Sequence, residues 1–483
     1  MNRRLVGLVL LAVAPMALSA CKRRDVSTVT RPYDAVVVTG ASIPAVQGIA
    51  PNRLVAFRFV DGTWQQIPVQ VDERAVLDLA TPKHLAPIGK TATFYTDANT
   101  WTGADPNADI DADDEISFMA RDAHGQARDI DKDGAYVLTR PAHTASNGVE
   151  IEVNDPRKTD SAAWVYLFQS DGTLDPAAGA PSINYSYALN AGDYKTKYSI
   201  SVGPNPENSR VTTNWYSLHF SDRWITDEMK ITATGATGAD ILDRHKSGFA
   251  GSCARTEDTF SAGPGAMIAN KTGPVRAIRS VLGANSGTYT QRDHIMYESR
   301  VDVVTYLRVH AIPPLRDWLD YSPAASGMTY RTNINPSGVT IDGVPDALPT
   351  DEVQYQLVSG APGSVVHTSR LDTSIPINPG DIKTFYRDDL TPPETQCTGD
   401  AVEYGASGWQ FDKDVPCTDP ALNCTDYLTT TRRMTFLGPS ATTNEGNTIA
   451  AETATPLTTT VKAFALNEVR ASYKGELRPC KTP

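Results

Sequence analysis

An acidic stretch constrains this chain more than any other feature. Residues 105–134 carry ten carboxylates against three basic side chains, so their formal charge is −7. Carboxylates at this density repel one another unless water, salt or a bound cation screens them, and regularly spaced oxygen ligands suit a hard cation such as Ca²⁺. The stretch therefore predicts either a solvated acidic surface or loops organised around calcium, and we favour the calcium hypothesis.

Oxygen-bearing side chains alternate along two runs within this stretch. The predicted calcium ligands are Asp105, Asn107, Asp109, Asp111 and Asp113 in the first run, and Asp129, Asp131 and Asp133 in the second. The second run ends in Gly134 and resembles the opening of an EF-hand loop, where Gly permits a sharp turn. The chain departs from that pattern because Arg140 stands where the loop needs a bidentate Glu, and the flanking segments look like strands. We expect two incomplete loops that pool their ligands, with Asp114 or Glu115 completing the shell.

The N-terminal segment indicates export and a lipid anchor. Arg3 and Arg4 precede an apolar run over residues 5–18, and Leu-Ser-Ala stands directly before Cys21. This arrangement resembles the signal and lipobox of bacterial lipoproteins. The resemblance implies cleavage before Cys21, lipidation of Cys21 and, because Lys22 rather than Asp follows, a place at the outer membrane or cell surface. The apolar run is shorter than the roughly 20 residues that span a bilayer.

The overall composition is that of a turn-rich globular protein. The chain has 483 residues, of which 40% are hydrophobic and 21% are charged, with 33 Pro and 34 Gly. This length predicts roughly two or three domains. The formal net charge of −12 argues against nucleic acid as a partner and against polyanionic substrates held by bulk charge, because the protein would repel them. It suits divalent cations and neutral partners better.

Cysteine usage indicates an oxidising compartment, although weakly. Apart from Cys21 the chain has five cysteines: Cys253, Cys397, Cys417, Cys424 and Cys480. An odd number permits at most two disulfides, and a local bridge between Cys417 and Cys424 is compatible with the short loop between them. The connectivity as a whole stays open. No Cys-x-x-Cys pair occurs, which argues against a zinc site.

Strand-forming segments dominate the chain and predict a mainly β fold. Residues 53–60 and 63–71 flank Asp61-Gly62, a strong hairpin signal because both turn positions favour positive φ. The segment 170–181 is rich in Gly, Pro, Ala and Asp and reads as a linker. We therefore predict two β-sandwich-like units, the second of them large and built of long antiparallel strands. The expected boundaries are a signal peptide over 1–20, a tether over 21–32, a first unit over 33–169, the linker over 170–181 and a second unit over 182–483.

The longest regular segment, residues 291–312, alternates between apolar and charged positions. It is too long for one ordinary strand, so it predicts two strands bent near 299–302 or the long strands of a large sandwich. On a continuous strand its charged side would form one face that offers acid, base and cation in one groove. The weak catalytic candidates on this face are His294, Glu298, Arg300, Tyr306, Arg308 and His310. A solvated sheet face with cross-strand ion pairs is the commoner explanation of such a pattern.

Familiar catalytic motifs are missing from the sequence. There is no His-Glu-x-x-His, no phosphate-binding Gly-x-x-x-x-Gly-Lys, and Gly405-Ala406-Ser407-Gly408 continues with Trp409 where a hydrolase elbow needs Gly. The sequence thus leaves two hypotheses. The first is a lipid-anchored, calcium-stabilised envelope protein with a non-enzymatic binding or scaffold role toward polysaccharide or a surface protein. The alternative is a carbohydrate-active enzyme, a lyase or hydrolase, that uses the face of residues 292–310.

Overall fold

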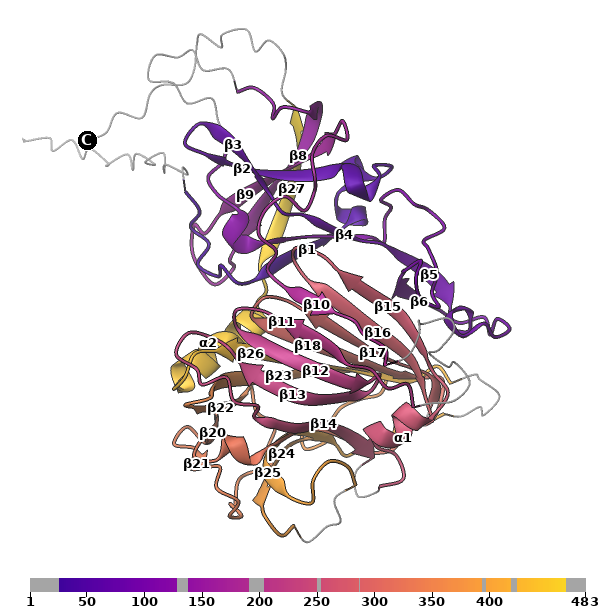
Figure 1. Ribbon diagram of the computed structural model, residues 1–483, viewed down its shortest axis with the longest axis vertical. Coiled ribbons are helices and arrows are strands. Elements are labelled where there is room, and N and C mark those ends of the chain that lie inside the picture. Colours follow the sequence, from indigo (N-terminus) through magenta and orange to yellow (C-terminus); the bar gives the residue numbers. More distant parts are fainter. Residues whose placement is uncertain are drawn as a thin grey trace, which may run out of the picture.

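The computed structural model describes residues 26–127, 138–190, 204–249, 253–285, 287–392, 397–417 and 424–465 (Figure 1). Strands account for 48% of it and helices for 9%, which confirms the predicted mainly β class. A smaller N-terminal unit and a large sandwich are stacked along the long axis (Figure 1). Within the described residues, no helix has the length and apolarity needed to cross a membrane.

The first unit is a small sandwich of two antiparallel sheets. Its five-stranded sheet has the order β27 (Thr458–Ala465), β8 (Thr144–Asn154), β9 (Ala163–Ser170), β2 (Leu54–Val60) and β3 (Thr63–Ile67). The three-stranded sheet has the order β1 (Ala35–Thr39), β7 (Glu115–Met119) and β4 (Gln70–Asp72). Alternate apolar side chains of both sheets, such as Ile116 and Val165, share one buried core. A separate hairpin of β5 (Arg74–Asp78) and β6 (Thr91–Tyr95) extends beside the second unit (Figure 1).

The turn between β2 and β3 confirms the predicted hairpin. Asp61 and Gly62 adopt φ of 48° and 81°, and Val60 pairs with Thr63 across them. Only Gly, and less readily Asn or Asp, enters this left-handed region at low cost, which is why this dipeptide fixes the turn.

The last described strand returns to the first unit. After α2 (Thr443–Ala454), β27 runs antiparallel to β8 and forms the edge of the five-stranded sheet. The predicted second unit, 182–483, therefore includes a strand that belongs structurally to the first. A boundary drawn at the linker cannot reveal this, because the pairing joins residues more than three hundred positions apart.

The second unit is a large sandwich of two layers. One layer is a nine-stranded sheet in the order β15 (Ala266–Thr272), β16 (Ala277–Ala284), β17 (Gly287–Met296), β18 (Arg300–Arg308), β26 (Tyr427–Leu437), β23 (Gly363–Thr373), β22 (Gln356–Gly360), β20 (Thr329–Thr332) and β21 (Val339–Thr340). The other layer begins with β10 (Asn184–Ser186), β11 (Ser209–Thr212), β12 (Tyr216–Asp222) and β13 (Ile225–Ile231). It continues with β14 (Leu242–Phe249), β19 (Leu315–Tyr321), β25 (Glu403–Phe411) and β24 (Ile382–Asp389), and β13 lies beside β14. The short helix α1 (Glu257–Ala262) packs at one end of this layer (Figure 1).

The long segment 291–312 forms two strands, which confirms the first of the two predicted alternatives, and the chain reverses between Met296 and Arg300. β17 and β18 are antiparallel neighbours, and Met296 pairs with Val301 across a tight connection in which the Tyr297 N–H donates to Arg300 O at 2.8 Å. Because an even-numbered residue is opposite an odd-numbered one, even positions before the turn share a face with odd positions after it. The predicted charged face is therefore divided between the two sides of the sheet.

Two disulfides are formed among the described residues. Cys417 is bonded to Cys424, which confirms the predicted local bridge, and Cys253 is bonded to Cys397 over a sequence separation of 144. The second bridge ties the end of β14 to the segment ahead of β25. It closes a much longer loop than the first.

Removing the Cys253–Cys397 bridge by a double Ser substitution should lower the free energy of unfolding by about 2–5 kcal/mol, because closure of a long loop restricts the unfolded chain most. The matched control is the double Ser variant of Cys417 and Cys424, whose separation is 7 and whose loss should cost less. Urea denaturation measures both. A larger loss from the short bridge would contradict this entropic account.

Candidate functional site

The described acidic run lies between β6 and β7 and is folded tightly on its own backbone. Asp105 Oδ1 accepts from the Asn107 N–H at 2.8 Å, Asn107 Oδ1 from the Asp109 N–H at 3.3 Å, and Asp111 Oδ1 from the Asp113 N–H at 3.2 Å. Short polar side chains favour such local bonds in place of regular structure. The alternation seen in the sequence thus becomes a series of turns. The second predicted run, Asp129, Asp131 and Asp133, lies outside the described residues, as does Cys21.

Buried anchors hold both halves of this loop in place. Ile110 is 1% exposed, and its backbone exchanges hydrogen bonds with Gly48 and Ile49. Asp114 is fully buried and accepts from the N–H groups of Arg74 and Asp111, each at 2.8 Å. The acidic side chains between these anchors therefore cannot separate freely to reduce their repulsion.

The carboxylates of the loop perturb one another electrostatically. Burial and the neighbouring Asp111 raise the pKa of Asp113 to about 6, while its hydrogen bond to Asp113 holds the pKa of Asp111 below its ordinary value. Burial, followed by nearby acids, also raises the pKa of Glu73 and Asp105. By hydrogen-bond geometry, Asp105 Oδ2 and Asp113 Oδ2 are buried atoms that accept from no donor among the described residues, although Thr96 and Lys271 offset part of the effect of burial on the pKa of Asp105. Two carboxylate oxygen atoms of the loop are therefore buried without a hydrogen-bond donor from the described residues.

The loop brings its carboxylates together in pairs rather than in a closed shell. Among the described residues, three carboxylates converge within 4.8 Å at a different place, formed by Asp243, Asp320 and Asp400. There the buried Lys246 ammonium pairs with Asp320 and lies 3.6 Å from Asp243 Oδ2. A lysine thus supplies the positive charge at this second cluster. At the acidic loop, Lys271 offsets part of the effect of burial on the pKa of Asp105, and Arg74 donates to Asp113 O and to Glu115.

Two of the six catalytic candidates hold the units together. Glu298, in the connection between β17 and β18, pairs with Arg121 of the first unit. Arg300 Nη1 lies 3.1 Å from Asp34 Oδ1, also of the first unit. Both ion pairs lie where the two units meet, so these side chains have a structural role.

A third ionic contact lies deeper in the same junction. Arg276 is 1% exposed; its Nε donates to Asp72 Oδ2 at 2.8 Å and its Nη2 to Glu115 Oε2 at 2.6 Å. Arg74 and Tyr95 also bind Glu115, at 2.7 and 2.8 Å. Although burial alone would raise it, Arg276 and Arg74 hold the pKa of Glu115 below its ordinary value. We call Asp72, Glu115 and Arg276 the junction triad.

His294 points into the sandwich interior, away from solvent. It is 2% exposed, and neither ring nitrogen has a hydrogen-bond partner among the described residues. Burial, followed by Arg292, lowers its pKa well below the ordinary value. The adjoining cavity is about 10 Å³, too small for a substrate. His294 is therefore a neutral interior residue.

The interior near His294 contains a saturated ionic cluster centred on Asp317. Its carboxylate accepts from Arg432 Nε at 2.7 Å, Ser247 Oγ at 2.8 Å and His245 Nε2 at 3.1 Å. Burial alone would raise the pKa of Asp317, but Arg432 and His245 hold it well below its ordinary value. All these groups are at most 7% exposed, so the cluster stabilises the packing of the two layers and offers no access to substrate.

The remaining candidates lie on the opposite side of the nine-stranded sheet. Tyr306 and Arg308 line a cavity beside the β5–β6 hairpin. His310 lies beyond the end of β18, with Nε2 3.2 Å from Thr290 Oγ1 and Nδ1 2.7 Å from Ala311 O. The structure therefore does not assemble the six side chains into one groove.

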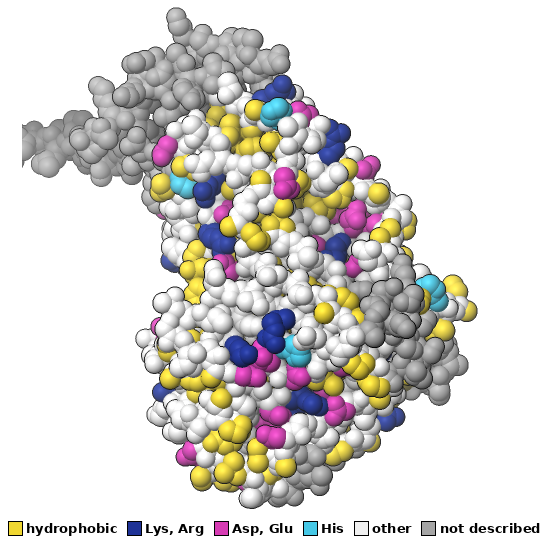
Figure 2. All heavy atoms as spheres, viewed as in Figure 1, with side chains coloured by type: hydrophobic (Ala, Val, Ile, Leu, Met, Phe, Trp, Pro, Cys, Tyr) yellow, Lys and Arg dark blue, Asp and Glu magenta, His cyan; other side chains and the backbone are white. Residues whose placement is uncertain are grey.

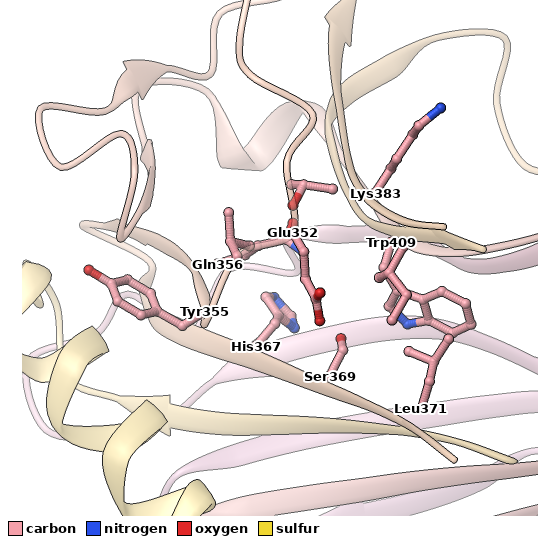
Figure 3. Close-up of a pocket in the computed structure, with 11 residues that line it drawn as sticks. Glu352, Tyr355, Gln356, His367, Ser369, Leu371, Lys383 and Trp409 are labelled. Carbon is pink, nitrogen blue, oxygen red and sulfur yellow. The ribbon is translucent and has the colours of Figure 1, made fainter. Parts of the chain in front are cut away.

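A small polar niche between the sandwich layers was not predicted from the sequence. Figure 3 shows Glu352, His367, Ser369 and Trp409 pointing toward one another near the beginning of β22. Tyr321 OH lies 2.9 Å from His367 Nε2, whereas His367 Nδ1 and Trp409 Nε1 have no hydrogen-bond partner in the part of the chain that the structure describes. The cavity of about 20 Å³ accommodates about one water molecule. No sequence spacing signals this niche, because it joins residues from four separate strands and loops.

One surface of the large sandwich carries interspersed charges of both signs (Figure 2). On β11, β12 and β13, Glu228 pairs with Arg210 and Lys230, and Asp227 pairs with His219 at 2.7 Å. Mixed charges of this kind create no extended field of one sign.

Comparison with known proteins gives no family model and no curated protein sequence that matches this chain. The functional conclusions below therefore rest on the residues and their geometry.

Replacing Arg276 by Met should lower the free energy of unfolding by about 3–5 kcal/mol, because Asp72, itself 1% exposed, would lose its cation. Urea denaturation provides the measurement. The control Lys383→Gln removes the more exposed pair with Asp412 and should cost about 0–1 kcal/mol. If both variants unfold at the same urea concentration as the parent, the junction triad has no stabilising role.

Proposed function

We propose that this chain is a lipid-anchored protein of the bacterial cell envelope with a non-enzymatic binding role, and that its acidic loop binds Ca²⁺. The observation that carries the calcium proposal is that Asp105 Oδ2 and Asp113 Oδ2, both buried, accept no hydrogen bond from an N–H or O–H donor of the described residues, in a loop anchored at Ile110 and Asp114. Burying carboxylate charge without a partner is costly, and a divalent cation removes that cost.

The donor set of the loop suits Ca²⁺ in chemistry. Carboxylates at 105, 109, 111 and 113 and the amide oxygen of Asn107 are hard oxygen ligands, and main-chain carbonyls between them can complete the six to eight that Ca²⁺ takes. Asp111 and Asp113 are already close enough to share a proton. A bound cation would replace that proton and draw the pairs toward one centre.

The binding role is supported by the positions of the catalytic candidates, which lie in separate parts of the structure. Glu298 and Arg300 are used in ion pairs between the units, and His294 is enclosed in the interior. The alternative of a carbohydrate-active enzyme at residues 292–310 would need these groups in one accessible groove. A binding protein needs no such convergence.

Calcium should raise the melting temperature of the processed chain, and a chelator should reverse the rise. A ligand that binds only the folded state adds about 2.7 kcal/mol at a hundredfold excess over its dissociation constant. The double variant Asp105→Asn with Asp113→Asn should lose this effect. The matched control Asp400→Asn, in the cluster that contains Lys246, should keep it. Calcium stabilisation that is absent from the parent chain, or equally large in the double variant, would refute the site.

The calcium effect should depend on pH with a defined sign. Because the folded-state pKa of Asp113 is about 6, above that of an ordinary carboxyl, the ion-free folded protein binds a proton that the unfolded chain releases. The ion-free protein should gain stability from Asp113 as pH falls through 6, and calcium stabilisation should diminish over the same range because protons compete for the carboxylate.

The anchor can be tested separately by detergent partitioning of the chain made in a Gram-negative bacterium. The parent should enter the detergent phase, and Cys21→Ser should stay in the aqueous phase, because the acyl chains supply the membrane affinity. Cys480→Ser serves as the control and should partition like the parent. Aqueous partitioning of the parent chain would exclude lipidation.

A further inference from the structure

A cavity of about 430 Å³ lies where the β5–β6 hairpin meets the nine-stranded sheet. This volume falls within the roughly 300–1,000 Å³ typical of small-molecule pockets. Its walls come from Leu79, Lys90 and Thr91 of the hairpin, from the end of β18, and from residues 424–429 at the start of β26. The two wall-forming units are held in fixed relation by the junction triad and by a shared apolar cluster that includes Phe94 and Leu282.

The lining combines cations, aromatic rings and apolar surface. Lys90 and Arg308 are the cations, Asp426 is the carboxylate, and the rings belong to Tyr306 and Tyr427. The Lys90 ammonium donates to the Cys424 carbonyl, and no carboxylate of the described residues pairs with it. Among the lining residues alone, two cations stand against one carboxylate, and the buried Asp293 also acts electrostatically on Arg308.

Arg308 is fixed in position before any ligand binds. Its Nε donates to Tyr289 O at 3.3 Å and its Nη2 to Gln291 Oε1 at 2.7 Å, and the guanidinium lies 5.7 Å from the centre of the Phe94 ring and 5.4 Å from that of Tyr306. Asp293 also acts electrostatically on this guanidinium. The two hydrogen bonds use two of its five N–H donors, so a guanidinium positioned in this way has donors left for a carboxylate.

The backbone at the cavity is strained. Val309, which lines it directly after Arg308, has φ of 65°, a left-handed conformation that is rare for a β-branched residue. Such strain persists only where the surrounding structure enforces it, and it occurs preferentially at ligand sites. Here it lies directly after Arg308, at the end of β18.

We propose that this cavity binds an acidic saccharide, a hydroxylated ring that bears a carboxylate. Arg308 and Lys90 hold the carboxylate, the Tyr306 and Tyr427 rings with Leu79 contact the apolar face of the sugar, and Thr91 and Thr429 bind hydroxyls. This inference rests on the proposed binding role and names its ligand class, but it requires neither Ca²⁺ nor the lipid anchor.

The test compares D-glucuronate and D-galacturonate with D-glucose and D-galactose by saturation-transfer NMR and calorimetry on the full processed chain. The acids should bind at least about tenfold more tightly than the neutral sugars, since hydrogen bonds to charged groups contribute more than neutral ones. Arg308→Gln should weaken the acids about tenfold or more and leave the neutral sugars nearly unchanged.

Two further variants separate ligand contacts from folding. Lys90→Met removes one cation whose only hydrogen bond in the described chain is to Cys424 O, and it should also weaken the acids selectively. Lys383→Gln, at the niche of Figure 3, is the control and should bind like the parent.

Equal binding of acidic and neutral sugars, no binding of either, or unchanged binding in folded Arg308→Gln and Lys90→Met would overturn the proposal. Loss of sugar binding with the calcium effect intact refutes this inference alone, and the reverse result refutes the calcium site alone.

Discussion

The structure depends on the buried contact of Arg276 with Asp72 and Glu115, because this contact joins the two units and lies next to both the acidic loop and the β5–β6 hairpin. Its guanidinium is 1% exposed and binds one carboxylate from each of β4 and β7. Glu115 directly follows the acidic loop and is also bound by Arg74, whose Nε donates to the carbonyl of Asp113 at 2.5 Å. Arg74, the first residue of β5, therefore connects the acidic loop and the β5–β6 hairpin to the same ionic cluster.

The interior of the large sandwich shows how many charges a β core accepts when each is paired. Asp317 is surrounded by Arg432, His245 and Ser247, and Arg279 pairs with Glu207, with both side chains fully buried. Such groups stabilise a structure only while their partners are in place. They fill the space between the layers, which leaves cavities the size of about one water molecule there and the larger cavity at the junction of the units.

Sequence reasoning succeeded for local features and failed for long-range ones. The Asp61-Gly62 hairpin, the Cys417–Cys424 bridge and the mainly β class are confirmed because each depends on residues close in sequence or on average composition. The prediction that residues 291–312 form a single charged face was wrong. After the connection that follows Met296, odd-numbered rather than even-numbered positions face inward. Glu298 and Arg300 could not be assigned to ion pairs, because Arg121 and Asp34 lie more than 170 residues away along the chain.

The sequence by itself determined that this chain forms strands and tight turns, and that its acidic run has alternating oxygens with too few cations. Only the tertiary structure decided that β27 returns to the first sheet and that His294 is enclosed while Tyr306 and Arg308 line a cavity. It also decided that Asp105 Oδ2 and Asp113 Oδ2 are buried without a hydrogen-bond donor from the described residues. The physical reason is that backbone preference and alternation act over a few residues. Burial and charge pairing arise instead from contacts between segments that the chain brings together only when it is folded.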